Sequence, residues 1–185
     1  LRQQRPLSVL TSAELVVGLR NETGTVELLT PAHGDAPRAR QPRRRGRIAA
    51  ALDGDDPGHG DFITKSSSPY DWRETRNNSL WQGVDGVNNP CPTGYRLPTK
   101  TEWEEEVGTW TGQNAAGAIG SVLKLPMSGG RDTRDGSVGS DNYARYWSSF
   151  LYRNFQPFNM FFNRDFYYMG GVLKTDGASV RCIKD

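Results

Sequence analysis

The chain has 185 residues, of which 35% are hydrophobic, and it contains 21 glycines and 11 prolines. This length fits one domain, and this composition favours short strands and loops over long helices. The 23 Lys and Arg are nearly balanced by 21 Asp and Glu, so the net charge of +2 gives no reason to expect a nucleic-acid partner. Since no run of 18 apolar residues occurs, we expect no membrane span.

The first 60 residues contain two β-type runs and an arginine-rich segment. The runs "AELVVGLR" and "GTVELLTP" have strand composition and are joined by "RNETG", a hairpin-like connection. Residues 38–47 then carry six arginines, and Pro42 within them excludes a regular helix. The arginines either bind phosphates or an acidic partner, or form a solvated loop. We expect a loop in which Arg43, Arg44 and Arg45 are exposed, because so many cations cannot be buried without carboxylate partners.

The segment "RLPTKTEWEEEVGTW" predicts the clearest helix of the chain, from Thr99 to about Val107. Thr99 and Glu102 fit a capping box, and Gly108 is suited to end the helix. The glutamates of this segment either take part in acid catalysis or form a solvated helix face, and we expect the solvated face; they are Glu102, Glu104, Glu105 and Glu106. The following "NAAGAIG" predicts a second short helix or a packing segment of small residues.

Further along the chain, "SVLKLPMSGG" predicts a strand that ends in a turn, and "RDTRDGSVGSDN" predicts a polar loop. Asp132, Asp135 and Asp141 in this loop offer oxygen ligands for calcium, but their spacing is not that of an EF-hand, and we expect no metal site. Three β-type pieces follow: "ARYWSS", "FNMFFN" and "GASVRCIKD". We expect "SVRCIKD" to be an inner strand of the sheet.

The aromatic residues gather near the end of the chain, where 12 of the 19 lie between Tyr143 and Tyr168. They alternate irregularly with polar residues, so they cannot all belong to one buried face. We expect a core contribution from Tyr146, Trp147, Phe158, Met160 and Phe162. Strand alternation in "FNMFFN" places Asn159 and Phe161 outside, and Tyr167 and Tyr168 lie in a turn-like region beside Gly170 and Gly171. The remaining rings, with Arg, Asn and Asp among them, have the composition of a binding surface.

Four separated segments occur in a fixed order across residues 61–185: "NNPCPTGYRLPTKTEWE", "LKLPMSGGR", "YWSS" and "SVRCIKD". Together they resemble the formylglycine-generating-enzyme-type branch of the C-type lectin fold. Within that branch, the chain is similar to the bacterial major paralogous domain family and to the variable proteins of diversity-generating retroelements. The resemblance implies an α+β, C-type lectin fold with a small twisted antiparallel sheet, two helices and long irregular loops. Residues 1–60 are then expected to pack on, or to be inserted in, the same domain.

In such variable proteins, asparagine codons are mutated at their adenines, and the diversified residues form an exposed ligand-binding surface. The resemblance places this variable region at about residues 144–176. We call a residue type reachable if mutation of the adenines in an asparagine codon can produce it. The blocks "FLYRNF" (150–155) and "NRDFYY" (163–168) contain only reachable residue types. Gln156, Met160, Met169 and Lys174 are unreachable and are expected to be fixed framework. The residues expected to converge on one exposed ligand-binding face are Phe150, Tyr152, Arg153, Asn154, Phe155, Asn159, Phe161, Arg164, Asp165, Phe166, Tyr167 and Tyr168.

The chain has two cysteines, Cys91 and Cys182, and this number is compatible with one disulfide or with two buried free thiols. Each adjoins a motif that the resemblance places at the base of the scaffold. The resemblance therefore implies that the two lie close in space, as a candidate disulfide.

The resemblance implies a display protein, surface-displayed or virion-associated, that binds a macromolecular ligand such as a protein or a surface glycan without a cofactor. One alternative is a non-variable structural or adhesion domain of a surface or virion protein. Another is a formylglycine-generating-type enzyme. Enzymes of that type bind copper through two C-terminal cysteines, whereas this chain has only Cys182 there. We therefore expect no enzyme. The short motifs of calcium-dependent sugar-binding lectins are also missing from the sequence.

Overall fold

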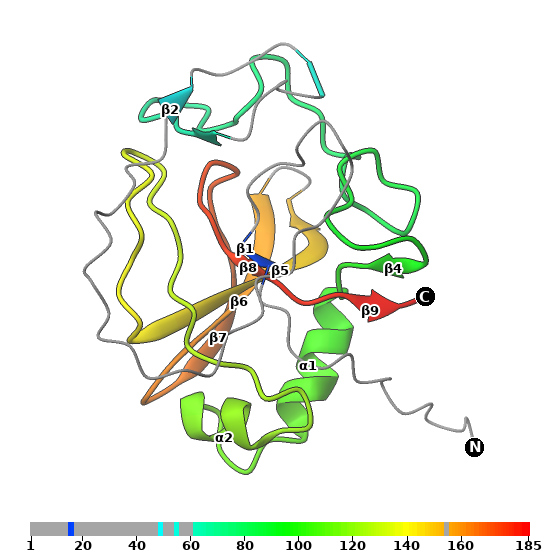
Figure 1. Cartoon of the computed structure of the whole chain (residues 1–185), viewed down its shortest axis with the longest axis vertical. Coiled ribbons are helices and arrows are strands. Elements are labelled where there is room, and N and C mark those ends of the chain that lie inside the picture. Colours follow the sequence, from blue (N-terminus) through cyan, green and yellow to red (C-terminus); the bar gives the residue numbers. More distant parts are fainter. Residues whose placement is uncertain (1–14, 17–47, 50–53, 56–60, 154–155) are drawn as a thin grey trace, which may run out of the picture.

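The computed structural model describes residues 15–16, 48–49, 54–55, 61–153 and 156–185. These residues form an α+β fold with two short helices and mostly antiparallel strands (Figure 1). The arginine-rich segment lies outside the described residues, as does most of the two N-terminal β-type runs. In chain order the elements are β1 (Leu15–Val16), β2 (Ile48–Ala49), β3 (Phe62–Ile63), β4 (Tyr95–Arg96), α1 (Lys100–Gly108), α2 (Ala115–Gly120), β5 (Tyr143–Tyr152), β6 (Gln156–Asn163), β7 (Tyr167–Gly171), β8 (Ser179–Val180) and β9 (Ile183–Lys184).

The main sheet has five strands in the order β1-β8-β5-β6-β7. Strands β5, β6 and β7 form an antiparallel meander, with Tyr143 opposite Asn163 and Phe161 opposite Tyr168. Two small pairs, β2 with β3 and β4 with β9, lie beside this sheet. Because consecutive turns of a meander lie at opposite ends of its middle strand, the β5–β6 and β6–β7 turns are separated by the whole length of β6 (Figure 1).

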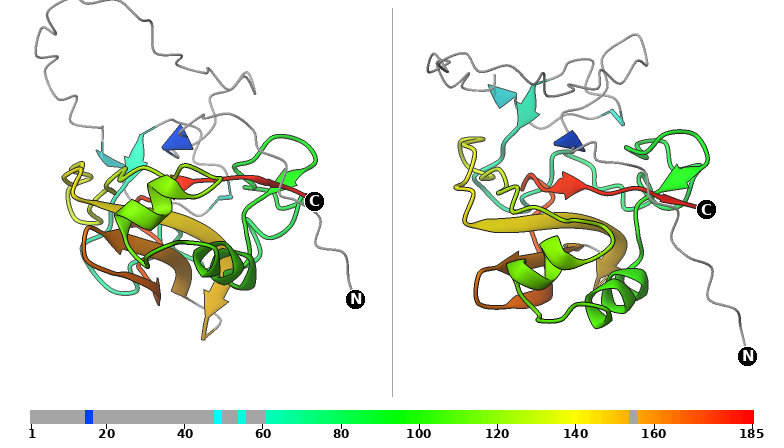
Figure 2. Two further views of the ribbon diagram at one scale, coloured as in Figure 1. Left: turned by 90° about the horizontal axis from the view of Figure 1, so that it is seen from below. Right: turned by 60° about the horizontal axis from the view of Figure 1, so that its bottom comes forward.

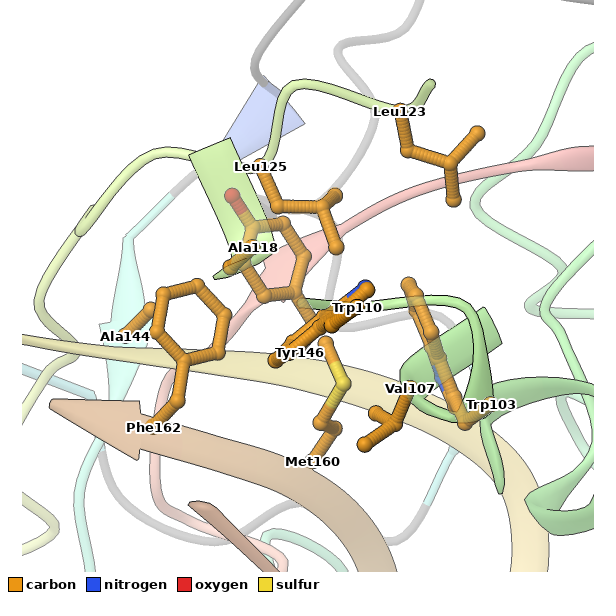
Figure 3. Packing of buried hydrophobic residues seen from close by; sticks show 10 residues of the cluster. All are labelled: Trp103, Val107, Trp110, Ala118, Leu123, Leu125, Ala144, Tyr146, Met160 and Phe162. Atoms are coloured by element: carbon orange, nitrogen blue, oxygen red, sulfur yellow. The ribbon is translucent and has the colours of Figure 1, made fainter. Parts of the chain in front are cut away.

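Both helices pack against one face of the sheet (Figure 2). Met160 and Phe162 of β6 are completely buried there, as strand alternation predicts. Figure 3 shows the rings of Tyr146, Trp110 and Phe162 gathered around Met160, and the Trp110 ring meets the Phe162 ring edge to face at 5.5 Å. Trp147 of β5 lines a cleft together with residues of the segments 61–90 and 174–177.

The helix predicted from Thr99 to about Val107 is confirmed as α1, with Thr99 as its N-cap. The Thr99 side chain accepts a hydrogen bond from the Glu102 amide, and the Glu102 carboxylate accepts one from the Thr99 amide, which completes the capping box. The Arg96 guanidinium donates two hydrogen bonds of 2.9 Å to the Glu102 carboxylate and one of 2.7 Å to Asp185. The start of the helix is thereby tied to the C-terminal end of the chain.

The predicted solvated glutamate face is correct for Glu104 and Glu105 but wrong for Glu106, which is buried. The Glu106 carboxylate accepts a hydrogen bond of 3.1 Å from the Trp110 indole nitrogen, one turn further along the chain. A buried tryptophan N–H requires an acceptor, and Glu106 supplies it. The prediction is also partly wrong for Glu102, which is half-buried and paired with Arg96.

The segment "NAAGAIG" contains a helix, α2, whose Asn114 cap accepts hydrogen bonds from the Ala116 and Gly117 amides. A side chain at Gly117 would lie 1.9 Å from the Gly112 carbonyl oxygen, so this close packing requires glycine. The strand predicted from "SVLKLPMSGG" is wrong, because the segment forms turns and only Gly129 makes an isolated bridge, to Ala144. Leu123 and Leu125 of this segment are buried in the core, and Met127 packs against it, without joining a sheet.

The C-terminal segment is divided between two sheets. Strand β8 is an inner strand, between β1 and β5, as predicted, but β9 leaves this sheet and pairs with β4. Between them, Cys182 forms a disulfide with Cys91, their Cα atoms being 5.7 Å apart. The expected proximity of the two cysteines is confirmed. No helix in the described part of the chain is long and apolar enough to cross a membrane.

Candidate ligand-binding surface

The β6–β7 turn is built by Asn163. Its side-chain oxygen accepts hydrogen bonds of 2.9 Å from the amides of Asp165 and Phe166, and its own amide donates to the Phe166 carbonyl at 3.0 Å. An asparagine that bonds to the backbone two and three residues ahead fixes a tight turn. Arg164 and Asp165 are exposed at the tip of this turn.

Four aromatic rings stack across the strands beside this turn. The Phe161 ring lies 5.6 Å from the Tyr143 ring, 4.8 Å from the Tyr168 ring and 5.9 Å from the Phe166 ring, with all three pairs near parallel. Phe166 is 49% exposed and Tyr168 is 43% exposed. We call Tyr143, Phe161, Phe166 and Tyr168 the ring stack. It gives the sheet face opposite the helices an apolar surface beside the β6–β7 turn, where Phe166 and Tyr168 reach solvent.

A second aromatic group lies at the β5–β6 turn. Phe150 and Tyr152 are 41% and 40% exposed, and both rings contact the buried Phe158 ring, at 5.3 and 6.1 Å. The Arg153 guanidinium lies 5.1 Å from the centre of the Tyr152 ring, and Arg153 has a positive φ of 49°, as a turn position does. Asn154 and Phe155, also expected in the binding surface, lie outside the described residues.

The expectation of a single exposed face is wrong. The exposed rings fall into two separate contact groups, one at each turn. Strand β6 has 8 residues and therefore spans about 25 Å between these turns. An extended strand separates the residues that flank it, whereas the expectation assumed that it would bring them together.

Two further expected positions are not exposed. Asn159 is completely buried at 0% exposure, and neither polar atom of its side chain has a hydrogen-bond partner. It faces away from the helices, as predicted, but that part of the sheet is also buried. Tyr167 belongs to strand β7, not to a turn, and its ring packs on the Trp110 ring at 6.2 Å. It therefore lies half-buried on the helix side.

The ring stack has charged groups of both signs around it. Beside Arg164 and Asp165, the Arg145 guanidinium lies 5.6 Å from the Tyr143 ring and 3.5 Å from the Asp176 carboxylate. Burial raises the pKa of Asp176, against the opposing effects of a hydrogen bond from the Leu173 amide and of Arg145. This mixture of rings and balanced charges suits contact with a polar and apolar partner surface.

Among the described residues, no group of three or more His, Cys, Asp or Glu side chains is placed to hold a metal ion. The carboxylate of Asp132 is bonded instead to Arg134, whose side-chain hydrogen bonds lower the pKa of Asp132 to about 2. Asp135 accepts a hydrogen bond from the Ser137 amide. These two aspartates therefore form hydrogen bonds within the polar loop.

Sequence reasoning missed Tyr143 as a member of the ring stack. Its place depends on the register of β5 against β6, which puts Arg145 opposite Phe161 and Tyr143 opposite Asn163. Only its aromatic character was visible in the sequence.

Comparison of the chain with protein-family models, with curated proteins and with solved structures gives no match. The contacts above are therefore the basis for any functional conclusion.

Proposed function

We propose that this protein is a ligand-binding display protein in which the turns of the β5–β6–β7 meander contact a macromolecular partner. One observation carries the proposal. Of the aromatic side chains in the described part of the chain, four are exposed, and all four lie at these two turns: Phe150, Tyr152, Phe166 and Tyr168. Exposed rings gathered on a folded surface mark contact sites, and such rings commonly provide most of the binding energy.

The ring stack is the principal contact in this proposal. Its rings lie face against face, so their edges and the Tyr hydroxyl groups are what a partner meets. This geometry leaves little ring face for a sugar to stack on and favours a protein partner, whose apolar side chains and carbonyl oxygens suit ring edges. The turn at Asn163 keeps the rings rigid, which lowers the entropy cost of binding.

We further propose that the scaffold is a C-type lectin fold of the formylglycine-generating-enzyme-type branch and that a retroelement diversifies the turns. Two observations support this. The two blocks of reachable residue types coincide with the two turns, and the unreachable Met160 and Lys174 have almost no exposed side-chain surface. Diversification would then change the contact residues and leave the packing intact. Asn159, a reachable type that is buried, falls outside the diversified set.

A randomised library tests the display function. Arg164, Asp165, Phe166 and Tyr168 are replaced together by mixtures of the reachable residue types, and the variants are selected against a panel of unrelated purified proteins. We expect most variants to fold with a melting temperature within a few degrees of the parent, because exposed substitutions change stability by about 0.5 kcal/mol or less, and some to bind a panel protein. A control library at Trp103, Val107 and Met160 should mostly fail to fold. If the two libraries fail equally, the turns are structural and the proposal is wrong.

The gene neighbourhood tests the retroelement part separately. A reverse transcriptase gene and a near-copy of the 3′ end of this gene, differing at the codons of the two turns, are expected nearby. Their absence would leave the binding surface as a fixed adhesion site.

A further inference from the structure

A buried lysine joins two segments that are far apart in the chain. The Lys174 side chain is only 4% exposed, and the Asp71 side chain beside it is 2% exposed. The Lys174 ammonium donates hydrogen bonds of 2.7 Å to Asp71 Oδ2 and to Asn78 Oδ1, and a longer one of 3.3 Å to the Asn77 carbonyl. An ion pair requires only the first of these contacts. The Asn78 contact also places an amide carbon beside an amine, which can react with it.

The surroundings of Lys174 favour its neutral, nucleophilic form. Burial lowers the pKa of Lys174, the contact with Asp71 opposes this effect, and the positive charges of Arg76 and Arg73 add to the lowering. A lysine amine becomes a nucleophile when it is desolvated or lies near other cations. Lys174 meets both conditions.

The amide carbon of Asn78 lies within reach of this amine. Because a C=O bond is about 1.2 Å long, a hydrogen bond of 2.7 Å to the amide oxygen places the Lys174 nitrogen about 3–4 Å from the amide carbon. Bond formation starts from a separation of about 3–3.5 Å. The folded chain therefore holds the two groups close to a reactive arrangement.

Asp71 lies where a general base is needed. Its distance of 2.7 Å from the Lys174 nitrogen is within the range of about 2.6–3.2 Å that proton transfer requires. Its second oxygen, Oδ1, accepts a hydrogen bond of 3.2 Å from the Arg73 amide, which helps to hold the carboxylate in place. Asp71 and Lys174 also line a hollow of about 340 Å³, through which a small leaving group can depart.

We propose that Lys174 and Asn78 form an intramolecular isopeptide bond, with Asp71 as the general base. Asp71 accepts one proton from the Lys174 ammonium, and the neutral amine then attacks Asn78 Cγ. The new N–C bond forms and the bond from Cγ to Nδ2 breaks. The attacking nitrogen passes a second proton to the departing NH₂ group, which leaves as ammonia and takes up the proton held by Asp71. The products are the amide link, an ammonium ion and the regenerated carboxylate, so atoms and charges balance.

The bond closes a loop between two positions that are 96 residues apart, similar to the 91 residues of the disulfide. Unlike the disulfide, an amide link is not opened by thiols. The ion pair of the freshly folded chain is the precursor of the bond. Because the two states differ in mass, the ion pair can be studied in chains that keep their full mass.

The test is the mass of the full chain after incubation in the folded state, measured under reducing and denaturing conditions. The folded chain is expected to lose one ammonia, about 17 Da, over several days, whereas a chain kept in concentrated urea should keep its mass. Trypsin should then release peptide 77–96 joined to peptide 165–181, because trypsin does not cleave after a lysine in an amide link. An asparagine that cyclises onto its own backbone also loses ammonia, so the joined peptide is the decisive observation.

Three variants assign the roles. Lys174→Arg keeps the positive charge without the amine and should abolish the loss of ammonia, while Lys184→Arg, at an exposed position of β9, is the matched control and should retain it. Asp71→Asn should slow the reaction by about a hundredfold or more, because it removes the base. If Lys174→Arg or Asp71→Asn fails to fold, the joined peptide of the unaltered chain still decides.

Three results would each overturn the proposal. They are an unchanged mass after prolonged incubation, a loss of ammonia without the joined peptide, and a link from Lys174 to Asp71 formed with loss of water. None of these results bears on the macromolecular surface at the turns.

Discussion

Replacing Lys174 by Met tests the most completely buried ion pair in the described part of the chain. The Lys174 and Asp71 side chains are only 4% and 2% exposed, with 2.7 Å between the ammonium nitrogen and the carboxylate. The same ammonium donates to the Asn78 side chain at 2.7 Å and to the Asn77 carbonyl at 3.3 Å. It thus joins the loop of residues 71–78 to the segment that follows β7.

The expected loss follows from the charge left behind. Removing one partner of a buried pair costs about 3–5 kcal/mol, because the other charge stays buried without compensation. Arg76 lies 3.5 Å from the same Asp71 oxygen, but its side chain is 41% exposed, so it compensates only in part. We therefore expect Lys174→Met to lower the free energy of unfolding by about 3 kcal/mol, at the lower end of that range.

Urea denaturation measures this loss, with the slope checked for a constant two-state transition. For a chain of this size, about 3 kcal/mol corresponds to a fall of roughly 6–12 °C in melting temperature. The double variant Asp71→Asn/Lys174→Met removes both charges and should regain at least half of the lost stability. Lys184→Met, at an exposed position of β9, is the matched control and should have little effect. A loss below about 1 kcal/mol for Lys174→Met, or a double variant no more stable than the single one, would refute the reasoning.

Three further predictions concern the scaffold. Reducing the Cys91–Cys182 disulfide, whose cysteines are 91 positions apart, should lower the free energy of unfolding by about 4–5 kcal/mol; denaturation with and without reductant measures this, and an unchanged midpoint would contradict it. Glu102→Gln should cost about 1 kcal/mol at pH 7. Burial works to raise the pKa of Glu102, but hydrogen bonds from Arg96 and Thr99 outweigh it, so the folded-state pKa lies below the ordinary 4.5. The stability that the carboxylate contributes is complete above pH 4.5 and is lost as the pH falls through the folded-state value, so the difference between Glu102→Gln and the parent should shrink in acid. If the stability difference between Glu102→Gln and the parent grew in acid, the predicted direction of the Glu102 pKa shift would be wrong. Asn159→Leu should raise the free energy of unfolding by about 1 kcal/mol, because it removes two unpaired buried polar atoms at nearly constant volume; a drop in melting temperature would indicate that the amide is hydrogen-bonded to water.

Features that depend on a few neighbouring residues were predictable from the sequence. The capping box of α1 joins two residues three positions apart, and the alternation of Met160 and Phe162 follows from strand geometry alone. The concentration of rings near the C-terminus also indicated a surface, and four of these rings are exposed. Such local rules do not extend to contacts between distant segments.

The positions that sequence reasoning missed depend on what lies across the fold. Asn159 and Phe161 share a face of β6 and cannot be told apart by alternation, yet Asn159 is completely buried while Phe161 joins the ring stack. Glu106 resembles its exposed neighbours in the sequence, but it is buried where it meets the Trp110 indole. In each case the outcome depends on a second segment whose position the local sequence does not contain.

The sequence by itself indicated β-type segments within β5 and β6 and the residue types available for binding, but it placed Tyr167 and Tyr168 of β7 in a turn. Tertiary structure decided that the two turns lie about 25 Å apart, since β6 is extended between them, and that Tyr143 stacks on Phe161. It also decided that three half-buried tryptophans from separate segments surround one cleft. The physical reason is that backbone hydrogen bonds and alternation act over a few residues, whereas burial and ring contacts depend on strand register and on which loops cover each face of the sheet.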